Sequence, residues 1–322
     1  MSQSVTIEEA ARLLLGADRI LLLTHQYPDG DTLGSGYALC RALQGLGKTV
    51  RVECSDEIPC KYAYMTDGVD VPAFDPAFIC AVDVADAKLL GPRLAPYADR
   101  VDLAIDHHAS HQDFQQYLLL DAAASATALI IYDLLKCLGA AITPAIANCL
   151  YTGLSTDTGC FKYGNTTPYA HRVAAELMDA GAETETINRV MFDCKSRARV
   201  ELERLALESM RFYWEGRLAV MIITNDMLET SRAAENDMEG LAPLPRQIEG
   251  VWVGITLRQK ADGNFKVSVR TGSHADASAI CAVLGGGGHK QAAGCAVNGP
   301  ADSAVEKLMD AVRTAVPSID CA

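Results

Sequence analysis

The sequence has no apolar run that approaches the ~20 residues of a membrane-spanning helix. It also has no excess of basic residues: the 322-residue chain carries 28 Lys and Arg against 41 Asp and Glu, a net charge of −13. This balance argues against a protein that binds long duplex nucleic acid by releasing counterions, whereas a short anionic substrate is compatible with it. The first residues show no basic region followed by an apolar stretch. We therefore expect a soluble, cytoplasmic protein with no membrane partner.

A disulfide framework is not indicated either. The eleven cysteines are odd in number, scattered from Cys40 to Cys321, and form no Cys-x-x-Cys pair, so reduced thiols are expected. Internal repeats and low-complexity tracts are also missing. Because the chain exceeds the ~100–200 residues of a usual domain, we expect two domains.

Residues 1–185 alternate short apolar runs with helical stretches, which predicts an α/β domain with a mainly parallel sheet. Thr6 to Glu9 predicts a capping box at the first helix. The strands are expected at 20–24, 49–53, 78–83 and 101–105, and the helices at 7–16, 32–46, 125–138, 144–156 and 168–180.

Residues 186–212 are charged and free of Gly and Pro, which predicts one long connecting helix. Residues 213–322 then predict a second, smaller α/β domain, with a hairpin around Asp262-Gly263. Its strands are expected at 217–224, 251–259 and 264–271, and its helices at 275–284 and 301–314. We expect an active site in a cleft between the two domains.

Three apolar runs of the first domain, 20–23, 78–82 and 101–105, lead directly into imidazole and carboxylate residues. Ligands of an open α/β sheet bind at the carboxyl ends of the strands, so these residues are expected to share one site. They are His25, Asp29 and Asp31 after the first run, Asp83 after the second, and Asp106, His107 and His108 after the third.

Each of these segments has a simpler explanation when it is taken alone. The first could be a solvated turn, Asp83 a helix cap and the third a surface loop. Asp157, just before Gly159, adds a carboxylate at a predicted helix end, which by itself is compatible with a plain C-terminal turn. In conjunction, an oxygen-rich set with two imidazoles favours a divalent-metal site that suits Mn²⁺ or Mg²⁺. The candidate ligands are His25, Asp29, Asp31, Asp83, His107 and Asp157.

These residues, in this order, resemble the four metal motifs of the DHH phosphoesterase superfamily. The segment from Gly285 to Gly294 resembles the glycine-rich signature of the DHHA1 domain, and with Lys266 to Arg270 the chain looks most like the branch that holds nanoRNases and pAp phosphatases. The resemblance covers nearly the whole chain. It departs at Thr271, where a serine is usual, and at Leu129, where many relatives have an acidic residue.

The resemblance implies a DHH domain and a DHHA1 domain that together hold two Mn²⁺ ions, for which Mg²⁺ or Co²⁺ are substitutes. It assigns one ion to His25, Asp29 and Asp83, and the other to Asp31, Asp83, His107 and Asp157. Asp83 would bridge ions ~3.5–4 Å apart that share an attacking hydroxide. Asp106 would orient an imidazole. His108 would contact a phosphoryl oxygen or assist the leaving oxygen.

The four-glycine run matches neither the P-loop nor the Rossmann pattern. Ahead of a helix, its backbone amides would form a phosphate cradle, and a flexible connection is an equal alternative. The residues of the predicted cradle are Gly286, Gly287, Gly288 and His289. Arg270, at a strand end, predicts a further phosphate contact, although it could be a plain surface residue.

The resemblance implies that the substrates are short RNA oligomers and linear dinucleotides, cleaved to nucleoside 5′-monophosphates, and 3′-phosphoadenosine 5′-phosphate (pAp), cleaved to AMP. A homodimer is compatible with it. The alternatives are a pyrophosphatase, a long single-strand exonuclease and a nucleotide-binding regulator without turnover. The glycine-rich signature argues against the first, the acidic charge and short length against the second, and the six filled ligand positions against the third.

Overall fold

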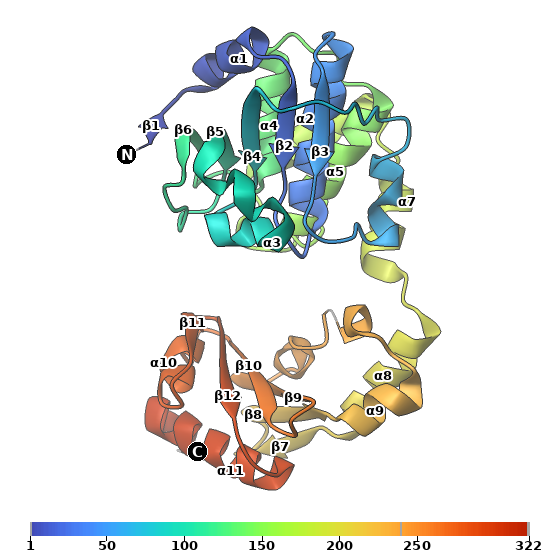
Figure 1. Ribbon diagram of the computed structural model, residues 1–322. Coiled ribbons are helices and arrows are strands. Elements are labelled where there is room, and N and C mark those ends of the chain that lie inside the picture. The colour runs from blue at the N-terminus through green and yellow to red at the C-terminus, as the bar shows by residue number, and fades with distance from the viewer. Residues whose placement is uncertain (1, 239, 321–322) are drawn as a thin grey trace. The chain divides into compact units, whose positions relative to one another are not determined.

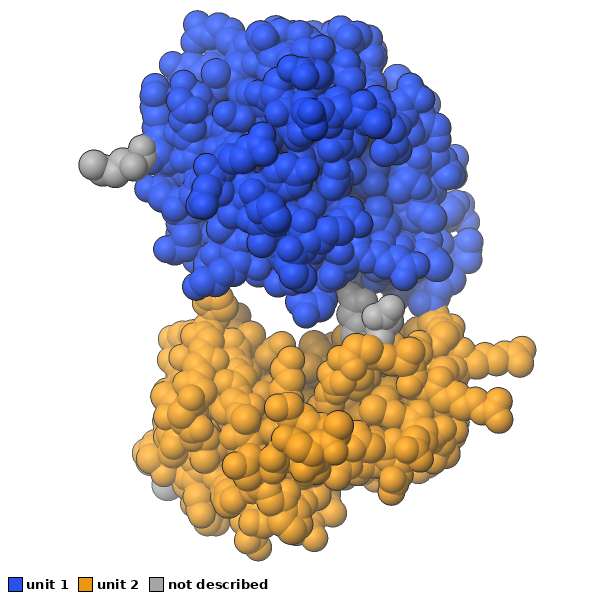
Figure 2. Space-filling view, in the orientation of Figure 1, with its two compact units in different colours: residues 1–194 blue, residues 195–322 orange. Residues whose placement is uncertain are grey.

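The computed structural model describes residues 2–238 and 240–320. The chain divides into two compact units, residues 1–194 and 195–322 (Figure 2). Each unit contains its own six-stranded sheet (Figure 1). Each unit also has its own hydrophobic core. Within the described residues, no helix is both long and apolar enough to cross a bilayer. The ten described cysteines are free thiols, whereas Cys321 lies outside the described residues.

The first unit is built on a fully parallel sheet in the order β1-β6-β5-β4-β2-β3. Its strands are β1 Gln3–Ser4, β2 Ile20–Leu23, β3 Val50–Glu53, β4 Phe78–Val82, β5 Val101–Asp106 and β6 Gln115–Leu120. The four predicted strands are confirmed, and β1 and β6 are additional. Two glutamines at the start of β6 interrupt its apolar pattern, which explains why the sequence did not predict it.

Helices cover both faces of this sheet, as a parallel sheet requires. The helices are α1 Ile7–Gly16, α2 Gly30–Gly45, α3 Gly91–Leu94, α4 Thr127–Cys137, α5 Pro144–Asp157 and α6 Pro168–Asp179, with 3₁₀ turns η1 Cys60–Met65, η2 Ala87–Leu90 and η3 Ala95–Arg100. Ile20 and Leu22 of β2 pack into the core under α1, α2, α4, α5 and α6, whereas Leu21 and Leu23 pack toward α3. The capping box is confirmed, since the Thr6 hydroxyl accepts a bond from the Glu9 amide.

The single connecting helix predicted for residues 186–212 is wrong. The segment forms α7 Thr184–Asn188, a π-helical turn η4 Arg189–Asp193, α8 Arg197–Glu208 and β7 Arg211–Tyr213. The break falls at Ser196, whose side chain accepts a hydrogen bond from the Arg199 amide at 2.9 Å and so starts a new helix.

The second unit contains a mixed sheet in the order β11-β12-β10-β9-β8-β7. The remaining elements are β8 Leu218–Ile223, α9 Asn225–Ser231, β9 Val253–Gln259, β10 Phe265–Thr271, α10 Ala277–Ala282, β11 Gly287–His289, β12 Ala292–Val297 and α11 Ala301–Ala315, with 3₁₀ turns η5 Glu235–Met238, η6 Leu244–Gln247 and η7 Pro317–Ile319. β9 and β10 form the antiparallel hairpin predicted around Asp262-Gly263. α10 and α11 pack on the apolar face of the sheet.

The glycine run does not precede a helix, and that prediction is wrong. Gly287 and Gly288 belong to β11, which pairs antiparallel with β12. A Cβ at Gly288 would lie 2.6 Å from the Ala293 Cα, so a larger residue would overlap the neighbouring strand. The glycines therefore allow a close-packed hairpin between β11 and β12 rather than a helix start.

Candidate functional site

The carboxyl ends of the parallel strands β2, β4 and β5 lie side by side, and the predicted ligand residues gather there. Asp29 is the N-cap of α2, where its carboxylate accepts hydrogen bonds from the Asp31 and Thr32 amides at 3.0 and 3.1 Å. Asp83 directly follows β4 and has a left-handed backbone with φ of 60°. Asp157 is the last residue of α5. Elements far apart in the sequence thus place their carboxylates together.

Two groups of these side chains have ligand atoms within 4.8 Å of one another: His25, Asp29 and Asp83 in one, and Asp31, His107 and Asp157 in the other. The His25 Nε2 lies 3.6 Å from Asp29 Oδ1 and 3.7 Å from Asp83 Oδ2. The His107 Nε2 lies 3.9 Å from Asp31 Oδ2 and 3.7 Å from Asp157 Oδ2.

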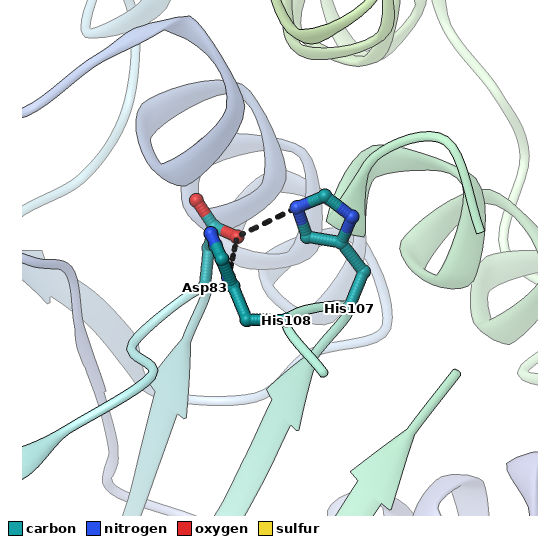
Figure 3. A group of neighbouring side chains, drawn as sticks. All are labelled: Asp83, His107 and His108. Carbon is teal, nitrogen blue, oxygen red and sulfur yellow. Dashed lines mark ion pairs between the residues drawn. The ribbon is translucent and has the colours of Figure 1, made fainter. Parts of the chain in front are cut away.

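Asp83 faces both groups. Its Oδ2 lies 3.7 Å from His25 Nε2, whereas its Oδ1 lies 3.9 Å from His107 Nε2 and 3.7 Å from His108 Nδ1. Figure 3 shows Asp83 with the two neighbouring histidines, His107 and His108. Asp83 also forms a third group with His107 and His108. The side chain is 2% exposed, so it is held between the two imidazole clusters rather than free in solvent.

The electrostatics of the site favour cations. Burial, together with the neighbouring Asp157, raises the pKa of Asp31 to about 7. Burial and the carboxylates of Asp31 and Asp29 raise the pKa of Asp83 well above its usual value. Several carboxylates thus share a buried space that lacks enough positive charge to keep all of them ionised. Divalent ions would supply that charge, and an oxygen-rich set with imidazoles suits such ions.

Known protein families match both units of the chain. Residues 19–154 match the DHH family, N-terminal domain, and residues 218–317 match the DHHA1 domain. The chain is 34% identical over 302 residues to the bifunctional oligoribonuclease and PAP phosphatase NrnA of Thermus thermophilus, which covers 91% of this chain and 89% of that relative.

The chain belongs to the DHH phosphoesterase family. It is also 24% identical over 295 residues to the Bacillus subtilis protein of the same name, covering 90% of this chain and 92% of that one. Among solved structures, an exopolyphosphatase-related protein from Bacteroides fragilis matches with 25% identity, a TM-score of 0.87 and 97% coverage of both chains. Each of these matches therefore spans nearly the whole of both proteins compared.

In the DHH domain, Asp106 positions a histidine. Its Oδ1 accepts bonds from the His107 amide at 2.8 Å and from His108 Nδ1 at 2.8 Å, and its Oδ2 lies 2.5 Å from His111 Nδ1. Burial alone would raise the pKa of Asp106, but the bonds from His108 and His111 lower it strongly. Asp106 thus remains ionised and fixes the ring of His108. Sequence reasoning missed His111, although it lies only five residues beyond Asp106.

Thr127, at the start of α4, is a second residue that sequence reasoning missed. Its amide donates to Asp31 Oδ2 at 2.7 Å, and its hydroxyl donates to Asp83 Oδ1 at 2.8 Å. The next amide, of Ala128, donates to Asp31 Oδ1 at 2.9 Å. The N-cap residue of α4 makes no side-chain hydrogen bond to the helix, so the carboxylate of Asp31, on α2, caps α4 instead. One helix start therefore orients two carboxylates of the site.

In the DHHA1 domain, Arg270 and His289 lie on one face of the sheet. Arg270 on β10 is directly opposite Ala292 on β12, which is in turn opposite His289 on β11. Directly opposed residues project to the same side of a sheet. Among the residues of the predicted cradle, His289 thus lies in the same row as Arg270. Gly286 instead packs against the backbone of Gly294.

Proposed function

We propose that this chain is a phosphoesterase that depends on two divalent cations. Its substrates are short RNA oligonucleotides, including linear dinucleotides, which it hydrolyses to 5′-mononucleotides, and pAp, which it hydrolyses to AMP. The observation that carries the proposal is Asp83, whose two oxygens face two separate groups of imidazole and carboxylate ligands. Relatives that span nearly the whole chain are named for oligoribonuclease and PAP phosphatase activity.

We assign His25, Asp29 and Asp83 to one cation, and Asp31, Asp83, His107 and Asp157 to the other. The mixed imidazole and carboxylate donors favour Mn²⁺, with Mg²⁺ or Co²⁺ as substitutes. When bound, two such cations lower the pKa of water and offset the negative charge that develops on the phosphoryl group.

The protein's own part in the chemistry is orientation. Asp106 holds the Nδ1 side of His108, which leaves the other ring nitrogen of this partly exposed side chain for a phosphoryl oxygen or the leaving oxygen. The Thr127 hydroxyl donates to the Asp83 carboxylate and so fixes its orientation between the His25 group and the His107 group. No nucleophilic Ser or Cys is required, because water is the attacking group.

A nuclease assay with and without added metal tests the proposal. Purified protein stripped with EDTA is supplied with Mn²⁺, Mg²⁺ or Co²⁺ and given a 5′-phosphorylated dinucleotide, pAp, or a long single strand. We expect mononucleotides from the dinucleotide and AMP from pAp, with Mn²⁺ as the most effective ion. Binding of both ligands without turnover would identify a nucleotide-binding regulator, and preferential degradation of the long strand would identify an exonuclease.

We propose that Arg270, with His289 in the same row of the sheet, binds a substrate phosphate remote from the reaction. We expect Arg270→Ala to raise KM by about tenfold on a 5′-phosphorylated dinucleotide and to leave kcat nearly unchanged, since it removes a charge-assisted hydrogen bond. The same dinucleotide without its 5′-phosphate is the control. An equal penalty on both substrates would show that Arg270 does not read the terminal phosphate.

The ten described cysteines are free, which accords with a reducing compartment, and we propose that the enzyme acts in the cytoplasm.

A further inference from the structure

One face of the sheet in the DHHA1 domain packs on the hydrophobic core, and the opposite face carries arginine side chains. Gly254 on β9, Arg270 on β10 and Ala292 on β12 are directly opposed, so they share a face. Their chain neighbours Ile255 and Val269 point the other way, into the hydrophobic core. The small residues opposite Arg270 on β9 and β12 allow another segment to approach this face closely.

Arg246 of η6 crosses the same face. A Cβ built on Gly254 would lie 2.9 Å from the Arg246 Cα, and a Cβ built on Gly272 would lie 3.1 Å from its Cζ. The Gly272 amide donates to the Trp252 carbonyl at 3.2 Å and so continues the ladder of β9 and β10. Gly272 lies two residues beyond Arg270 and therefore faces the same side. The Arg246 side chain thus runs over two glycines and ends beside the strand that carries Arg270.

These two arginines differ from a third on the same face. Arg258 forms a two-bond ion pair with Glu235, with Nη1 to Oε1 at 2.6 Å. In residues 2–238 and 240–320, no carboxylate pairs with Arg246 or Arg270, and the Arg246 Nε is buried without a hydrogen-bond partner. A half-buried guanidinium without a counter-charge is unfavourable unless an anion binds it.

We propose that Arg246 and Arg270 together bind a terminal phosphate of the substrate, Arg246 being the second guanidinium of the site. The inference rests on the proposed function and names the group that the second domain recognises. A phosphate monoester carries nearly two negative charges at neutral pH, whereas an internal phosphodiester carries one. Two planar guanidinium groups therefore complement the charge and the oxygens of a terminal phosphate better than those of an internal one.

Kinetics on a pair of substrates tests the assignment. On a 5′-phosphorylated dinucleotide, Arg246→Ala is expected to raise KM by roughly ten- to a hundredfold with little change in kcat. On the same dinucleotide without the 5′-phosphate, the variant and the wild type are expected to agree within about twofold. Arg246→Lys, which keeps the charge but not the fork, is expected to fall between them on the phosphorylated substrate. Arg258→Ala is the matched control, and it should not distinguish the two substrates.

Two outcomes would overturn the assignment: an unchanged KM in Arg246→Ala, or an equal loss on both dinucleotides, which would indicate a structural role. Should Arg246→Ala not fold, Arg246→Lys carries the same comparison. Equilibrium binding of a fluorescent 5′-mononucleotide in EDTA provides a readout that needs no turnover. Weaker binding by Arg246→Ala, with no such change for the matching nucleoside, supports the site even if the wild type hydrolyses neither dinucleotide, whereas equal affinity in variant and wild type refutes it.

Discussion

Asp83→Asn is expected to lower kcat by at least about a thousandfold at saturating Mn²⁺, and by more than His25→Ala does. The reason is geometric. Asp83 Oδ2 lies 3.7 Å from His25 Nε2, and its Oδ1 lies 3.9 Å from His107 Nε2. An amide in its place keeps the shape but removes the negative charge and one oxygen acceptor. Both proposed cation sites are weakened at once, whereas His25→Ala removes a ligand from one.

Steady-state kinetics and metal content, measured on the same protein samples, check this prediction. His25→Ala is the matched single-site control and should retain more bound metal than Asp83→Asn. Thr127→Val provides a milder perturbation, since it removes the hydroxyl that donates to Asp83 Oδ1 but leaves the carboxylate. An Asp83→Asn loss no greater than that of His25→Ala would contradict the shared role of Asp83.

The sequence was sufficient to predict where the candidate ligand residues gather, because each of them follows a strand or ends a helix in a recognisable local pattern. Each apolar run ended in an imidazole or carboxylate, and a parallel sheet brings such ends to one edge. His25 and Asp83 could therefore be expected to meet although α2, β3, η1 and β4 separate them in the chain. The grouping of Asp31 with His107 and Asp157 rested on family resemblance, and the structure places these side chains together.

The sequence pattern could not predict contacts between residues that are distant in the chain. Thr127 looked like an ordinary residue near a helix start, and only folding shows that it reaches Asp31 and Asp83. Arg246 lies in the short 3₁₀ turn η6, which no hydrophobic periodicity indicates, and its relation to Arg270 depends on the register of β9 and β10. Nothing in the local chain could have indicated either contact.

Errors in the secondary-structure prediction had local physical causes. The strands β11 and β12 consist mostly of Gly and Ala, which lack the alternation of large apolar and polar residues that indicates a strand. The same glycines are compatible with a helix start or with a tight hairpin, and tertiary packing selects the hairpin. In the connection, Ser196 competes with the helix by capping the next one, and the charged sequence around it concealed that boundary.

Oligonucleotide length is expected to affect activity strongly. The chain carries a net charge of −13. The proposed mechanism binds phosphate at two places, the cations and the pair Arg246 and Arg270. Each further nucleotide makes no additional contact with the cations or the arginines, and it adds a phosphate that a negatively charged surface repels. With Mn²⁺ at fixed ionic strength, kcat/KM should be highest for about two to four nucleotides and at least ~100-fold lower by about twenty.

A length series of single-stranded RNA, all with a 5′-phosphate, measures this dependence. Raising the salt concentration should narrow the difference between short and long oligomers, because screening weakens the repulsion of the added phosphates. A dependence that is flat or rises with length would reveal a basic track that the overall charge conceals. It would then favour a processive exonuclease over an enzyme that finishes short fragments.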